Sequence, residues 1–77
     1  MKISLRTADG QLKFRFKEAT FSMSIPTSTL ELMATKKNIK YEDGSVATMF
    51  TMTEDMKVVN PFGDLFLFKG DYIVFEA

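Results

Sequence analysis

The chain has 77 residues, 45% of them hydrophobic and 26% charged, and its ten basic and ten acidic side chains cancel to zero net charge. It contains no Cys and no His, which excludes disulfide bonds and structural zinc sites. The lack of imidazole and thiolate groups also removes common catalytic side chains, and so short a chain seldom encloses a deep cleft. We therefore expect one non-enzymatic domain over residues 1–77, with no catalytic residues, metal, cofactor or small-molecule substrate.

The chain shows no signal for a membrane. No apolar run approaches the ~18 residues that a membrane-spanning helix requires. The start, Met1 to Arg6, reaches a cation too early for a secretory signal. We expect a folded cytoplasmic protein with no membrane partner.

Residues 1–17 predict a β-hairpin. Apolar and polar side chains alternate over residues 2–6 and again over residues 12–17, on either side of Asp9 and Gly10. Period-two alternation is typical of strands with one buried face, and Asp-Gly favours a short turn between two strands.

Residues 20–37 predict a strand followed by a short helix. The strand covers residues 20–25, whose apolar side chains alternate inward. Ser28 and Glu31 have the spacing of a capping box, which favours a helix over residues 29–37. Two lysines near the end of this helix suit the negative end of its dipole.

The rest of the chain predicts a β-meander. Strands are expected over residues 46–52 and 56–59, with a turn at residues 60–63. Residues 65–68 and 72–75 then form a second hairpin. The predicted fold is α+β: an N-terminal hairpin, one short helix and a C-terminal meander that closes a β-grasp-like sheet or a small barrel.

The second hairpin is apolar on both faces, as strands covered on both sides tend to be. One face then lies inside a small barrel or against another chain, or the segment is a central strand beneath the helix; the pattern favours neither. The contact with another chain would use six residues: Leu65, Phe66, Leu67, Phe68, Tyr72 and Val74.

Two segments resemble known families. Residues 1–17, with a helix after them, resemble the opening hairpin of ubiquitin-like β-grasp domains. Within residues 56–75, Asn60-Pro61-Phe62-Gly63-Asp64 and Lys69-Gly70-Asp71-Tyr72-Ile73-Val74 are similar to the Pro-Gly-Asp-Tyr-Ile hairpin of small phage and prophage proteins, with Lys69 at the position of the Pro. This second resemblance implies a phage or mobile-element gene, and a protein that inhibits or modulates a host protein in the host cytoplasm.

Charge is distributed unevenly along the chain. Residues 1–40 carry eight basic and three acidic side chains, whereas residues 41–77 carry two and seven. Alternation places five cations on the outer face of the first hairpin: Lys2, Arg6, Lys13, Arg15 and Lys17. Three interpretations remain open for this basic face: a solvated surface, a contact with an acidic protein surface that includes a second copy, or a contact with a phosphate backbone.

The acidic residues offer weaker candidates. Glu42-Asp43 and Glu54-Asp55 lack the alternating ligands of a calcium loop, so solvated turns are expected. Asp64 and Asp71 would approach each other across the second hairpin as an acid–base pair, although Asp beside Gly is also common in turns.

The function best supported by the sequence is non-enzymatic binding of a protein partner, with a homodimer as one form. The alternatives are a nucleic-acid-binding module that uses the basic face, and a virion or assembly component.

Overall fold

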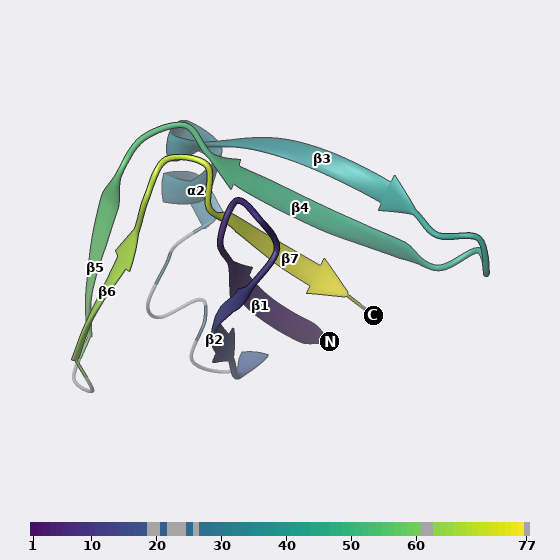
Figure 1. The fold of residues 1–77 in the computed structure, drawn as a ribbon, viewed down its shortest axis with the longest axis horizontal. Coiled ribbons are helices and arrows are strands. Elements are labelled where there is room, and N and C mark those ends of the chain that lie inside the picture. The colour runs from purple at the N-terminus through teal and green to yellow at the C-terminus, as the bar shows by residue number, and fades with distance from the viewer. Residues whose placement is uncertain (19–20, 22–24, 26, 61–62, 77) are drawn as a thin grey trace.

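A computed structural model describes residues 1–18, 21, 25, 27–60 and 63–76. Within this part the chain is mainly β with a short helix, in agreement with the coarse expectation of strands around one helix (Figure 1). The elements are β1 (Lys2–Arg6), β2 (Leu12–Phe16), α2 (Thr27–Met33), β3 (Ala34–Lys40), β4 (Val46–Met52), β5 (Met56–Asn60), β6 (Gly63–Leu67) and β7 (Tyr72–Glu76). None of the helical residues described form a helix long and apolar enough to cross a bilayer.

Five strands form one antiparallel sheet in the order β2-β1-β7-β4-β3, and β5 and β6 form a separate antiparallel pair. The sheet is open, because β2 and β3 are edge strands that do not pair with each other. The small barrel that we considered is therefore wrong. The five strands of the large sheet end in two edge strands instead of closing on themselves.

The N-terminal hairpin is confirmed. Ile3 lies opposite Phe16 and Leu5 lies opposite Phe14, so all four side chains point to the same face of the sheet. The turn is closed by a hydrogen bond of 2.9 Å from the Gly10 amide to the Thr7 carbonyl. Gly10 has a φ of 94°, a conformation that glycine adopts without steric cost.

The helix is shorter than predicted. α2 ends at Met33, and Ala34 begins a strand that pairs residue by residue with β4. Residues 35–38 are all exposed, so a helix there would have buried no apolar face, whereas the strand gains a ladder along seven residues. Tertiary pairing has therefore overridden the capping and dipole signals.

The strand predicted over residues 20–25 lies mostly outside the described residues. Phe21 and Ile25 are described, and both are buried as expected. Their amides donate to the carbonyls four residues earlier, Phe21 to Lys17 at 3.0 Å and Ile25 to Phe21 at 2.8 Å, which is the spacing of helical turns. The turn predicted at residues 60–63 also includes two residues that are not described.

The predicted second hairpin is wrong in its pairing. β6 pairs with β5, while β7 lies between β1 and β4 at the centre of the large sheet. The interpretation of residues 72–75 as a central strand is thus confirmed. The expected meander is not continuous, because β5 and β6 pair with each other and β7 pairs with β4. The apolar character of β7 on both faces reflects this central position.

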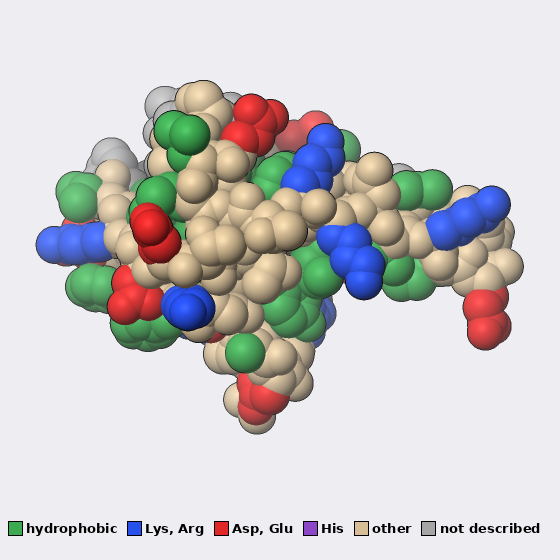
Figure 2. Space-filling view, turned by 90° about the horizontal axis from the view of Figure 1, so that it is seen from above, with side chains coloured by type: hydrophobic (Ala, Val, Ile, Leu, Met, Phe, Trp, Pro, Cys, Tyr) green, Lys and Arg blue, Asp and Glu red, His purple; other side chains and the backbone are tan. Residues whose placement is uncertain are grey.

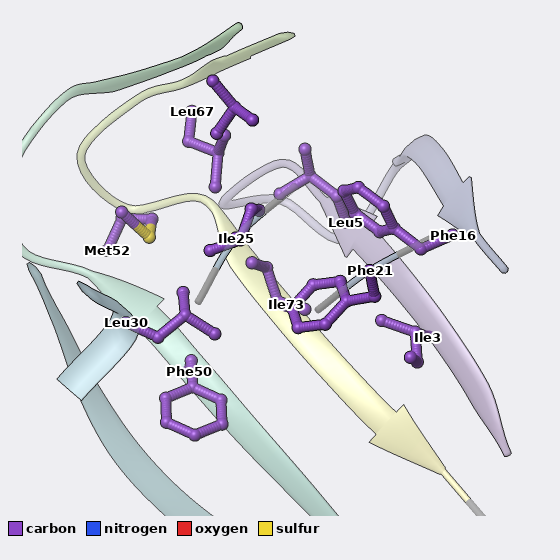
Figure 3. Close-up of a cluster of buried hydrophobic side chains, with 11 residues drawn as sticks. Ile3, Leu5, Phe16, Phe21, Ile25, Leu30, Phe50, Met52, Leu67 and Ile73 are labelled. Atoms are coloured by element: carbon purple, nitrogen blue, oxygen red, sulfur yellow. The ribbon is translucent and has the colours of Figure 1, made fainter. Parts of the chain in front are cut away.

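The core lies between one face of the large sheet, the segment that contains α2, and the base of the β5–β6 hairpin (Figure 3). Strands β1, β4 and β7 contribute Leu5, Phe50 and Ile73, and Leu30 comes from the helix. Val58 and Leu67 bring the small hairpin into the same cluster. Edge-to-face aromatic contacts extend this cluster, including Phe21 with Phe75 at 5.0 Å between ring centroids. Such contacts stabilise the fold beyond the burial of apolar area alone.

The β3–β4 hairpin projects from this core as an arm, visible at the right of Figure 1. Its turn repeats the hydrogen bonds of the first hairpin. The Tyr41 amide donates to the Ser45 carbonyl at 2.9 Å, and the Gly44 amide donates to the Tyr41 carbonyl at 3.0 Å. Most β3 side chains are exposed along the arm, so its stability depends mainly on strand pairing.

Two leucines of α2 test the packing of the helix. Leu30 is fully buried, whereas Leu32 is 84% exposed. Leu30→Ala should lower the free energy of unfolding by about 3 kcal/mol, because it leaves a cavity in the core. Leu32→Ala should change it by less than about 0.5 kcal/mol. Urea denaturation measures both, and equal effects would contradict the observed helix orientation.

Candidate functional site

The five cations of the predicted basic face do not share one environment. Lys2, Arg6 and Arg15 lie on the side of the sheet opposite the core, which we call the open face. Lys2, Ser4 and Arg6 alternate along β1 with side chains that enter the core, so they point to the opposite side. Arg15 lies opposite Ser4 and therefore points to that side as well. Lys17 is exposed just beyond the end of β2.

Lys13 is held in an ion pair instead. Its Nζ lies 2.7 Å from the Asp71 carboxylate, and the two side chains are only 22% and 8% exposed. The same ammonium donates to the Phe66 carbonyl at 3.0 Å, and the Asp71 carboxylate also accepts the Phe68 amide at 2.9 Å. Lys13 therefore fastens the first hairpin to the segment between β6 and β7, and its charge is already balanced.

Arg6 is also partly committed. Its Nη1 donates to the Gly10 carbonyl at 2.9 Å, which holds the guanidinium against its own turn. Lys2 lies opposite Glu76 in the ladder with β7. Among the described residues, Arg15 makes no ion pair, so the open face keeps some of the predicted positive charge.

One row of side chains crosses the whole open face. From edge to edge it contains Lys37, Met49, Val74, Ser4 and Arg15, one from each strand. Cations therefore stand at both edges, with small or apolar side chains between them. Ser4 and Val74, in the middle of this row, are nevertheless buried. Sequence reasoning missed Lys37 here because it assigned the residue to a helix.

The six residues of the predicted apolar interface also separate. Leu67 is fully buried and Leu65 is half-buried against the core, whereas Phe66 and Phe68 are exposed. Tyr72 and Val74 belong to β7 and lie on the open face. The structure thus brings Phe66 and Phe68 together but separates them from the last two.

Phe66 in β6 and Phe68, just after the end of β6, form an exposed aromatic surface. Their rings are stacked, with centroids 6.5 Å apart and planes 9° apart, and they are 50% and 54% exposed. Val59, on the β5–β6 hairpin, is 72% exposed. We call Lys13, Lys57, Val59, Phe66 and Phe68 the aromatic ledge.

Cations rest on both rings of the aromatic ledge. Lys13 Nζ lies 4.6 Å from the Phe68 centroid, and Lys57 Nζ lies 5.8 Å from the Phe66 centroid. Lys57 is also paired with Asp64 at 3.1 Å. In Figure 2, the end of the molecule formed by this hairpin shows hydrophobic side chains around a basic one. One predicted cation and two predicted apolar residues thus meet in a single site.

The acidic residues do not assemble a catalytic or metal site within the described part of the chain. Asp64 and Asp71 each face a different lysine, so they do not form the acid–base pair considered above. No group of three acidic side chains with metal-binding geometry occurs among the described residues.

The turn acids are used locally. The Asp43 carboxylate accepts bonds from the Ser45 hydroxyl at 2.6 Å and the Ser45 amide at 2.9 Å, and these bonds lower the pKa of Asp43. The Thr7 hydroxyl likewise lowers the pKa of Asp9 in the matching turn.

Comparison with known proteins finds no matching family, no similar curated protein and no similar solved structure.

The Lys13–Asp71 pair predicts a large difference between two lysines. Lys13→Met leaves a carboxylate that is 8% exposed without its counter-ion, so the free energy of unfolding should fall by roughly 3 kcal/mol. Lys57→Met removes a half-exposed pair and should cost less than about 1 kcal/mol. Denaturant titration of both variants provides the measurement, and similar losses would show that the Asp71 pair contributes no more than a surface pair.

The Asp43 hydrogen bonds predict an acid-side pH dependence. Because its pKa is lowered from an ordinary value of 3.8, the charged form stabilises the folded arm above that pH. This stabilisation is lost as the pH falls through the lowered pKa. Carboxyl-carbon NMR titration should place the midpoint of Asp43 below 3.8, and Ser45→Ala should raise it while Asp9 stays unchanged. A midpoint at or above 3.8 in the unmodified chain would contradict the turn geometry.

Proposed function

We propose that the protein is a non-enzymatic binding module that docks on a protein partner through the aromatic ledge. The observation behind this proposal is the stacked pair of Phe66 and Phe68, each about half exposed on a hairpin beside the main sheet. Aromatic side chains of this kind are the usual anchors of protein interfaces. Small monomeric domains rarely leave such groups uncovered together.

The surroundings of the two rings support binding at low entropic cost. Lys13 and Lys57 lie over the ring faces, and each lysine is fixed by a carboxylate. These contacts favour one orientation of each ring before a partner arrives, which reduces the cost of immobilising it. Apolar groups at the centre with charged groups at the rim match the general anatomy of protein interfaces.

The charges of the ledge favour a protein over a nucleic acid. Unpaired cations bind a phosphate backbone by displacing the counter-ions condensed on it. Both lysines of this site already have carboxylate partners, at 2.7 Å for Lys13 and 3.1 Å for Lys57. The ledge thus offers apolar contact area with little net positive charge, which suits a protein pocket.

We further propose where the protein acts and on what. It acts in the cytoplasm, and its partner is a host protein that it inhibits or modulates. The support for this role is the similarity of residues 56–75, which include the ledge, to the hairpin of small phage proteins.

Removal of the two rings tests the ledge. Phe66→Ser with Phe68→Ser should leave the fold intact, because both side chains point away from the core, and should abolish capture of the partner by the immobilised protein. The matched control is Leu32→Ser, which removes an exposed leucine on α2. Quantitative mass spectrometry of captured proteins provides the readout.

Three other results would contradict the proposal or change the partner. Capture that survives the double substitution would overturn the ledge as the docking surface. Binding of an oligonucleotide that weakens steeply with added salt would favour the nucleic-acid alternative. A mass that rises with concentration, and falls to that of a monomer in the double variant, would identify the partner as a second copy.

A further inference from the structure

The outer edge of the arm is a second surface, independent of the aromatic ledge. β3 pairs with β4 on one side and is an edge strand on the other, so alternate backbone amides and carbonyls along it face outward. Only Ala34 and Ile39 of its seven residues are partly buried; the other five are exposed. The arm stands clear of the core, so a further strand has room to approach (Figure 1).

Three of the seven residues of this edge are lysines. Lys36 and Lys40 point to one face of the arm and Lys37 to the other, because they lie opposite Phe50, Val46 and Met49 respectively. Within the described residues none of the three forms an ion pair, and β4 carries no charge. Figure 2 shows basic side chains spaced along the arm and acidic ones at its tip.

We infer that β3 accepts an acidic, extended segment of a partner protein as an added antiparallel strand. Strand addition supplies main-chain hydrogen bonds, and side chains opposite one another set the specificity. Directly opposed residues lie about 5 Å apart, so a carboxylate opposite each lysine is stabilising and a cation there is destabilising. The geometry requires acids at the first, fourth and fifth positions of the segment, opposite Lys40, Lys37 and Lys36.

The same lysines disfavour a second copy on this edge. In a symmetric antiparallel pairing centred on Asn38, Lys36 of each copy would face Lys40 of the other. Lysines on edge strands commonly prevent such self-association. Here they also favour an acidic partner strand over a basic one, because repulsion of the wrong partner is one source of specificity.

A designed peptide tests this site without knowledge of the partner. The probe is the acetylated and amidated peptide Glu-Val-Thr-Glu-Glu-Val-Thr, added to the intact protein labelled with nitrogen-15. We expect shift changes at the amides of β3 and β4, protection of outward-facing β3 amides from exchange, and weaker binding at high salt. The peptide with Gln in place of Glu should bind at least about tenfold more weakly.

Backbone methylation separates strand addition from simple charge attraction. In an antiparallel pair only alternate residues of the peptide direct their amides to β3. Of two peptides N-methylated on the alternate sets, one should therefore lose binding and the other should keep it. Equal binding of both would overturn strand addition, as would shift changes centred on Arg15 and the open face.

Charge reversal of the protein completes the test. Lys36→Glu with Lys40→Glu should weaken peptide binding by about tenfold or more, as two attractive cross-strand pairs become repulsive. Lys2→Glu with Lys69→Glu makes the same change of net charge outside both the edge and the ledge and should have little effect. Phe66→Ser with Phe68→Ser should leave peptide binding unchanged, so failure at the edge and failure at the ledge are distinguishable. Unchanged affinity in the β3 double variant would overturn the inference.

Discussion

The arrangement of this molecule depends on one buried carboxylate. Asp71 accepts hydrogen bonds from Lys13 of β2 and from the Phe68 amide, while its own carbonyl accepts the Met52 amide at 2.8 Å. It thereby joins the edge of the first hairpin, the end of β4 and the turn that leads out of β6. An isolated pair of strands such as β5 and β6 is marginally stable in water. Burial of Val58 and Leu67 holds the base of this pair, and the Asp71 contacts fix the turn beside it, so the aromatic ledge has a defined place on the sheet.

Local pattern predicted the strands better than it predicted their partners. Alternation around Asp9 and Gly10 specified the first hairpin, since its pairing is set by the turn itself. The same signals located Val46–Met52 correctly. Tyr72–Glu76, however, pairs with strands about 25 and 70 residues earlier, and no local signal encodes that choice. Its apolar character on both faces did indicate a central strand. The error was to pair it with the nearest apolar segment, which is itself half exposed.

The missed strand β3 explains why the candidate sites were only partly predicted. Residues 34–40 contain no alternating apolar face, because an exposed arm has no core to alternate against. Lysines that suited the end of a helix dipole lie instead on a sheet edge and on the open face. For the first hairpin, alternation correctly placed Arg15 away from the core, but it could not show that Lys13 reaches Asp71, 58 residues away. The hydrophobicity of Phe66 and Phe68 was evident, whereas their exposure depends on Val58 and Leu65 taking the inward positions.

The pairing state of the lysines, more than their number, distinguishes the surfaces. Where lysines lie beside exposed aromatic rings, as Lys13 and Lys57 do, a carboxylate balances each of them. Where they lie on the arm, within the described residues, no carboxylate does. A neutralised cation over a ring still orders the ring but offers little attraction to an anion, so the ledge discriminates by shape and apolar area. Unbalanced cations on an open strand edge discriminate by charge. A strand that lacks acids at the matching positions would displace water from three ammonium groups without forming ion pairs in return, which costs free energy. A chain with zero net charge can therefore present two surfaces of different selectivity, because neither β3 nor β4 contains an acidic residue.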